Sequence, residues 1–191
     1  MGKTKEVLFR SRDLPGMGIS HGRLPMLLRR GEAERVARGL YRWVKQPPSE
    51  KFTMAAVCKV VPEAIVCLLS ALRLHGIGTQ DPHEIWIAVN RKAWKPRPRG
   101  LPIRVVRFSG AALTYGVEER VFDGVPVRVT NPARTVVDCF RYRNKIGLDV
   151  ALEALEEAIR GRKTTRDAIA RAAGMLRAAN VIRPYLESFS R

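Results

Sequence analysis

Residues 118–140, EERVFDGVPVRVTNPARTVVDCF, hold the two local signals that decide the fold class. Asp123-Gly124 separates two β-branched stretches, and this dipeptide is a strong signal for a tight hairpin turn. Asn131-Pro132 follows a few residues later, in the order typical of a helix cap followed by proline in the first turn. A hairpin that leads directly into a helix predicts a mixed α+β fold.

Similar signals extend over the residues on both sides of this stretch. Clusters of β-branched residues indicate strands, and apolar residues at helical spacing indicate helices. The expected strands are 85–89, 103–108, 118–122 and 125–129. The expected helices are 52–60, 63–75, one that begins at 131–132, 148–160, one capped by Thr164 or Thr165, and a last short one. This order predicts an α+β domain with a helical C-terminal tail.

A proline-rich break, Gln46-Pro47-Pro48-Ser49-Glu50, divides the chain, because two consecutive prolines continue neither a helix nor a strand ladder. We therefore predict two domains, a short basic one over residues 1–45 and a larger α+β domain over residues 46–191. In the first domain the signals run helix, tight turn, helix and β-hairpin. That order predicts a small winged helix-turn-helix.

Two short helices are predicted in residues 1–45. Ser11 and Ser20 can cap them, and leucines on one face of each would turn inward. Pro15 and Pro25 lie about one turn inside these helices, where an interior proline costs about 3 kcal/mol. The second helix therefore begins either at His21 or at Pro25.

The wing is predicted from residues 34–43, which indicate two short strands around Arg38-Gly39. Gly31 suits the position after the end of the preceding helix. A winged module normally has a further helix before the helix-turn-helix pair, and only residues 2–9 are available for it. We therefore expect the first helix to be short or missing.

Charge is the unusual feature of the composition. The chain has 35 lysine and arginine residues against 18 aspartate and glutamate residues, a formal net charge of +17 over 191 residues. Such an excess attracts polyanions, of which DNA or RNA is the commonest, although acidic proteins and anionic membranes are alternatives.

Neither a membrane span nor a signal peptide is predicted, because the chain has no run of about 18 apolar residues and only a short apolar stretch near its start. Cys58, Cys67 and Cys139 are odd in number and have apolar neighbours, which indicates buried free thiols in a reducing compartment. We expect a cytoplasmic protein.

The candidate DNA-binding residues lie on the second predicted helix and on the wing. With the leucines facing inward, arginines on the other face could read guanine edges or contact phosphates, and wing arginines would contact the DNA backbone. The alternative is a solvated basic helix without a ligand. The candidates are Ser20, His21, Arg23, Arg29, Arg30, Arg35, Arg38 and Arg42.

A second basic surface is predicted between two expected strands, in a loop that has five basic residues, one tryptophan and no acidic residue. Such a loop could stack on and neutralise nucleic acid, or meet an acidic partner. The alternative is a solvated loop with its tryptophan packed against the core. The residues concerned are Arg91, Lys92, Trp94, Lys95, Arg97 and Arg99.

No catalytic residue, metal site or cofactor is predicted. Asp149, Glu153, Glu156 and Glu157 share one expected helix, but an acidic solvated face explains them as well as a metal site does. No phosphate-binding glycine loop, serine elbow or paired metal motif occurs in the sequence. Arg134 and Asp138, one helical turn apart, predict a structural ion pair. We expect a protein that is not an enzyme.

Several motifs together resemble the AbiEi-type antitoxins. The N-terminal stretches Gly18-Ile19-Ser20, Leu27–Gly31 and Glu34–Arg42 are similar to the winged domain of that family. Leu68–Ile77, Gly124–Val127, Asn131–Phe140 and Gly147–Leu155 are similar to its larger domain. The likeness extends over nearly the whole chain, and the combination is more specific than any single motif.

The resemblance implies an antitoxin of a two-gene toxin–antitoxin and phage-defence system. It implies a winged domain that binds double-stranded operator DNA and represses its own operon. It also implies a C-terminal domain that counters a nucleotidyltransferase-like toxin, with or without direct contact. The operator sequence, the toxin and the oligomeric state do not follow from the resemblance.

Two other functions remain open. The first is a basic interaction protein that binds an acidic toxin or an RNA without sequence-specific DNA recognition. The second is a DNA-processing nuclease, which would need the acidic cluster on residues 148–160 to hold a metal.

Overall fold

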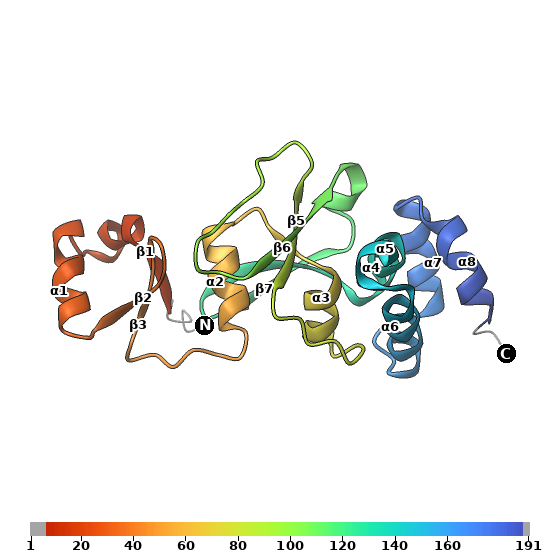
Figure 1. Cartoon of the computed structure of the whole chain (residues 1–191), viewed down its shortest axis with the longest axis horizontal. Helices are drawn as coiled ribbons and strands as arrows, with labels where there is room; N and C mark the ends of the chain where they lie inside the picture. The colour runs from red at the N-terminus through yellow and green to blue at the C-terminus, as the bar shows by residue number, and fades with distance from the viewer. Residues whose placement is uncertain (1–6, 189–191) are drawn as a thin grey trace. The chain divides into compact units, whose positions relative to one another are not determined.

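The computed structural model describes residues 7–188, which form a mixed α+β structure with a helical C-terminal end. The chain forms two compact units (Figure 1). The N-terminal unit consists of the residues up to Ala64 together with Pro96–Ile103 and Glu119–Val127. The C-terminal unit consists of Ile65–Lys95, Arg104–Glu118 and the residues from Arg128 onward. The α+β fold class is as predicted.

The N-terminal unit contains a three-stranded antiparallel sheet of β1 (Leu8–Arg10), β2 (Ala33–Ala37) and β3 (Leu40–Trp43), in the order β1-β3-β2. The predicted hairpin around Arg38-Gly39 joins β2 to β3, and Gly39 supplies the positive φ of 74° at the turn. The sequence analysis missed β1, because three residues are too few to display the alternation that identifies a strand. Part of the 2–9 stretch considered for a first helix lies outside the described residues, and Leu8 and Phe9 belong to β1.

Two short 3-10 helices and one α-helix connect β1 to β2. They are η1 (Ser11–Met17), η2 (His21–Arg23) and α1 (Leu24–Arg29). The α-helix begins at the Pro25 alternative, since this proline lies in its first turn. The cap predicted at Ser11 is wrong, because Ser11 lies within η1 and Asp13 accepts the Arg10 amide at 2.8 Å. Ser20 does occupy the N-cap position of η2, but its side chain makes no cap hydrogen bond.

A small apolar core lies beneath these elements. Phe9, Leu14, Leu27 and Ala33 are buried together, and the Phe9 ring stacks on Trp43 with centroids 4.5 Å apart. The predicted helix α2 (Phe52–Val60) packs against β1 in the same unit.

A five-stranded sheet follows in the order β6-β5-β4-β8-β7. Its strands are β4 (Ile65–Val66), β5 (Ile85–Asn90), β6 (Ile103–Phe108), β7 (Val117–Phe122) and β8 (Val125–Thr130). Strand β4 is antiparallel to β5 and parallel to β8. The predicted hairpin is confirmed, with φ of 50° at Asp123 and 79° at Gly124, as a type I′ turn requires.

One helix prediction is wrong in part. Residues 63–75 are not one helix, because the β-branched pair Ile65-Val66 forms β4 and the chain enters α3 (Leu68–His75) only after an extended Cys67. A short buried strand and a buried helix both appear in sequence as continuous apolar runs, so periodicity does not separate them.

Helices make up most of the C-terminal unit. They are α3, α4 (Pro132–Arg141), α5 (Arg143–Ile146), α6 (Leu148–Arg160), α7 (Arg166–Met175) and α8 (Ala179–Ser188), with a 3-10 turn η3 (Gly110–Leu113) after β6. Helix α4 lies among the other helices of this unit and contacts α3, α6, α7 and α8 (Figure 1). Its residues 133–140 are all buried. The predicted caps are present: the Asn131 side chain accepts the Arg134 amide at 2.9 Å, and Thr165 accepts that of Ala168 at 3.2 Å. Helix α4 is therefore the centre of this unit.

Between residues 7 and 188, no helix is both long enough and apolar enough to cross a membrane.

Candidate functional site

The basic residues proposed to face DNA lie mostly on the outside of the N-terminal unit. Leu27 is buried, and on the other face of η2 and α1 the side chains of His21, Arg23, Arg29 and Arg30 are exposed. Ser20 is exposed just before them. This arrangement presents a basic helix face, although the helix itself is a short α-helix preceded by a 3-10 turn rather than one continuous helix.

The wing arginines differ in their surroundings. Arg38 is exposed at the turn between β2 and β3. Arg35 donates a long hydrogen bond of 3.4 Å to the Ala37 carbonyl oxygen. Arg42 is only 17% exposed, forms an ion pair with Glu34 and donates to the Gln46 carbonyl oxygen at 3.2 Å. Arg38 is therefore free to meet a ligand, whereas Arg42 already joins β3 to β2 and to the segment after β3.

The loop between β5 and β6 contains neither helix nor strand from residue 91 to 102. Trp94 is 96% exposed, so the alternative in which this tryptophan packs against the core is wrong. The first part of the loop is held by Arg107, which donates to the carbonyl oxygens of Asn90 at 2.9 Å and Ala93 at 2.7 Å. Arg91, Lys92, Trp94 and Lys95 are exposed in the C-terminal unit, and Arg97 and Arg99 are exposed in the N-terminal unit.

The ion pair predicted between Arg134 and Asp138 is present and fully buried. Arg134 Nε donates to Asp138 Oδ2 at 2.7 Å, and neither side chain is exposed. The same guanidinium donates to the carbonyl oxygens of Tyr115 and Ala112 and lies 4.8 Å from the centre of the Phe108 ring. Arg134 thus ties α4 to the connection between β6 and β7.

Asp138 also holds a second arginine at the edge of the core. Its Oδ1 atom accepts a hydrogen bond from Arg141 at 3.0 Å, and 29% of the Arg141 side chain is exposed. Burial raises the pKa of Asp138, and the two guanidinium groups oppose that rise by stabilising the carboxylate. Both oxygens of this buried carboxylate therefore have charged partners.

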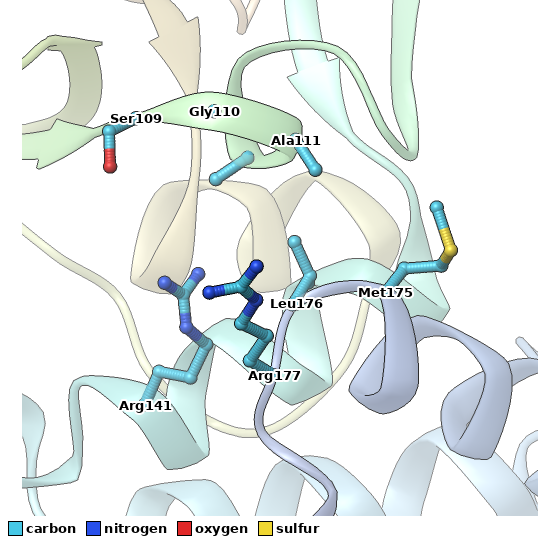
Figure 2. Close-up of a pocket in the computed structure, with 8 residues that line it drawn as sticks. Ser109, Gly110, Ala111, Arg141, Met175, Leu176 and Arg177 are labelled. Carbon is cyan, nitrogen blue, oxygen red and sulfur yellow. The ribbon is translucent and has the colours of Figure 1, made fainter.

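A pocket of about 550 Å³ opens beside Arg141 (Figure 2). Its wall comes from the β6–η3 turn, the end of α4 and the end of α7. The lining residues are Ser109, Gly110, Ala111, Ala112, Arg141, Met175, Leu176 and Arg177. The sequence analysis did not identify this pocket, because its parts are far apart in sequence and share no motif.

Three of the four acidic residues of α6, Glu153, Glu156 and Glu157, have structural partners. Glu157 accepts the Gly78 amide at 2.7 Å, Glu153 accepts the Thr79 amide and hydroxyl at 3.0 and 2.8 Å, and Glu156 pairs with Arg160. Over residues 7–188 no three His, Cys, Asp or Glu side chains are grouped so that they could hold a metal ion. The carboxylates of Glu153 and Glu157 thus fix the turn after α3.

The three cysteines are buried and unpaired, as predicted. Burial raises the pKa of the Cys58 thiol to about 12 and raises the pKa values of Cys67 and Cys139 as well. His75 is also buried and bonds through Nε2 to the Thr130 carbonyl oxygen at 2.7 Å. These groups belong to the packed interior of the protein.

The fold is mixed α+β with exposed basic residues in both units, and comparison with known proteins identifies the family. Residues 64–185 match the family described as the AbiEi antitoxin C-terminal domain, so the chain belongs to that family. The family defines it as an antitoxin of a toxin–antitoxin system, as the sequence motifs suggested.

A solved structure supports the fold over a longer stretch. The crystal structure of the RV2827C protein from Mycobacterium tuberculosis is similar to this chain with a TM-score of 0.63 and 16% sequence identity. The similarity covers 97% of this chain and 73% of that protein. At this level of identity the likeness concerns the fold alone. No curated protein sequence matches the chain.

Proposed function

We propose that this protein is the antitoxin of an AbiE-type two-gene system, acting in the cytoplasm and without catalytic activity of its own. In this proposal residues 1–45 bind double-stranded operator DNA as a winged helix-turn-helix and repress the operon. Residues 46–191 counter a nucleotidyltransferase-like toxin. The observation that carries the proposal is the family match over residues 64–185, since it assigns an antitoxin domain to the larger part of the chain.

The geometry of the N-terminal unit supports the DNA-binding part of the proposal. The short helix α1 carries exposed Arg29, has exposed Arg23 and Arg30 at its two ends, and is followed by an antiparallel hairpin with exposed Arg38 at its turn. Helix and hairpin thus offer separate basic contacts, one suited to a groove and one to the phosphate backbone. The formal charge of +17 would speed the encounter with DNA.

A gel-shift measurement with the DNA upstream of the protein's own gene tests this part. We expect the wild-type chain to bind that duplex more tightly than a shuffled duplex of equal length and composition. The double variant Arg23→Ala with Arg30→Ala should lose the preference. The matched control is Arg171→Ala with Arg183→Ala, which removes the same charge from exposed positions on α7 and α8. Equal binding of both duplexes by the wild type would refute sequence-specific repression.

A second candidate function rests on the exposed tryptophan of the β5–β6 loop. Trp94 is 96% exposed beside Lys95, and an aromatic ring next to basic groups can stack on unpaired bases. This candidate is a basic interaction protein that binds RNA or an acidic toxin without reading DNA sequence. Single-stranded RNA that binds wild type but not Trp94→Ala, with no operator preference, would favour it.

A further inference from the structure

The pocket at the end of α4 and α7 carries two guanidinium groups. Arg141 comes from the last turn of α4, and Arg177 comes from the turn after α7. Figure 2 shows both side chains directed into the pocket, toward the turn formed by Ser109, Gly110 and Ala111. Two positive groups thus face one small volume from different elements.

The charges around this pocket do not balance. The Asp138 carboxylate pairs with both Arg134 and Arg141. Arg134 Nε lies 2.7 Å from its Oδ2 atom, and a guanidinium nitrogen of Arg141 lies 3.0 Å from its Oδ1 atom. The Arg177 side chain has neither a hydrogen bond nor an ion pair among the described residues. Two guanidinium groups therefore share one carboxylate, and the guanidinium group of Arg177 has no carboxylate partner among the described residues. Like charges held close together are unfavourable, and an anion between Arg141 and Arg177 would relieve that repulsion.

The backbone at the end of α7 sets the direction from which the Arg177 side chain starts. Helix α7 ends with the hydrogen bonds Ala178 N to Ala173 O at 2.8 Å and Arg177 N to Gly174 O at 3.2 Å. In this termination pattern the residue at the position of Arg177 is usually glycine, because it takes a left-handed conformation. Arg177 has a φ of 54°, which side-chain-bearing L residues disfavour.

The lining indicates the chemical class of the ligand. Guanidinium groups recognise phosphate oxygens by paired, charge-assisted hydrogen bonds, and two of them can hold one dianion. The volume of about 550 Å³ exceeds what one inorganic phosphate fills and lies within the range of small-molecule sites. Leu176 and Met175 add apolar surface, and Met175 is 54% exposed at the rim.

From these observations we infer that this pocket binds a phosphate monoester of about nucleotide size, with the phosphate between Arg141 and Arg177 and the organic part against Met175 and Leu176. The inference is independent of the proposed DNA contacts, which involve the N-terminal unit. It adds a small-molecule site to the antitoxin domain.

Isothermal titration calorimetry on the full chain tests the site with AMP, adenosine and inorganic phosphate as probes. We expect AMP to bind, inorganic phosphate to bind more weakly than AMP, and adenosine not to bind. Arg177→Ala should weaken AMP binding at least tenfold. Arg171→Ala is the control, because it removes an exposed arginine of α7 outside the pocket and should leave binding unchanged.

The variant Arg177→Gly separates binding from folding. Glycine suits the left-handed position, so its melting temperature should equal or exceed that of the wild type while AMP binding falls as in Arg177→Ala. No binding of AMP at millimolar concentration would overturn the inference, as would equal binding by Arg177→Ala and wild type. Adenosine binding as tightly as AMP would overturn the claim that the site recognises a phosphate group. Inorganic phosphate binding as tightly as AMP would overturn the claim that the site also contacts the organic part of the ligand.

Discussion

Arg134 and Asp138 form an ion pair in which Nε lies 2.7 Å from Oδ2 and neither side chain is exposed. The pair lies one turn apart on α4, the helix that contacts most of the others in the C-terminal unit. Its guanidinium also satisfies the carbonyl oxygens of Ala112 and Tyr115. The pair therefore fixes α4 against the connection between β6 and β7 rather than forming a catalytic site.

Arg134→Ala should destabilise the protein by about 3–5 kcal/mol, because it leaves Asp138 buried without its closest partner. Urea unfolding followed by circular dichroism measures this change. The control is Arg104→Ala, which breaks the 3.7 Å pair with Glu84 at side chains 59% and 45% exposed. A loss of at most about 1 kcal/mol is expected there. Equal losses in both variants would contradict the structural role of the buried pair.

Gly116 lies against the same arginine. It has a φ of 62°, and a Cβ atom added to it would lie 2.9 Å from Arg134 Cβ. Gly116→Ala should therefore cost about 1–3 kcal/mol through the left-handed backbone alone, with crowding against Arg134 in addition. Thermal unfolding checks this against Gly22→Ala, where no atom lies within 4 Å of the added Cβ and the expected change is within about 0.5 kcal/mol. A Gly116→Ala variant as stable as Gly22→Ala would show that this contact is not tight in solution.

The three thiols should resist modification in the folded protein. Cys58, Cys67 and Cys139 are buried, and the pKa of Cys58 is raised to about 12, so almost no thiolate is present at pH 8. Titration with a thiol-reactive dye at pH 8 should show no fast-reacting group in the native state and all three after unfolding in urea. Rapid reaction of one thiol before unfolding would contradict the packing described for it.

Trp94 should dominate quenching of tryptophan fluorescence. It is 96% exposed, whereas Trp86 is 7% exposed and Trp43 is partly buried. Trp94→Phe should therefore remove most of the emission that acrylamide quenches readily, and Trp86→Phe should leave that fraction in place. If acrylamide quenches the same fraction of the emission in both variants, the loop covers Trp94 in solution and the prediction is wrong.

Local signals predicted much of the fold. Asp123-Gly124 and Asn131-Pro132 carry their own conformational preferences, so the hairpin and the start of α4 were recognisable without tertiary information. Strands β1 and β4 could not be recognised in the sequence, because they have only three and two residues and are defined by the strands with which they pair. The serines and leucines of the N-terminal segment predicted two short helices, but not that η1 and η2 would be 3-10 turns.

The candidate sites also differ in whether the sequence alone could predict them. A basic helix face and a basic loop follow from charge and spacing, so Arg23 and Trp94 could be singled out in sequence. The pocket could not, because Arg177 acts from a position where the usual residue is glycine, and Arg141 meets it only after α4 and α7 have packed. A sequence motif cannot identify a site whose residues come from one turn and two helix ends that are far apart in the chain.

The central claim is that this chain is an antitoxin that protects the cell from the toxin made by its partner gene. The most direct measurement is the growth of cells that express the neighbouring toxin gene, with and without this chain supplied from a separate promoter. We predict that the full chain restores growth to the level of cells without toxin, and that Arg23→Ala with Arg30→Ala still does so. Continued growth arrest, with the chain present and folded at a level above that of the toxin, would contradict the claim.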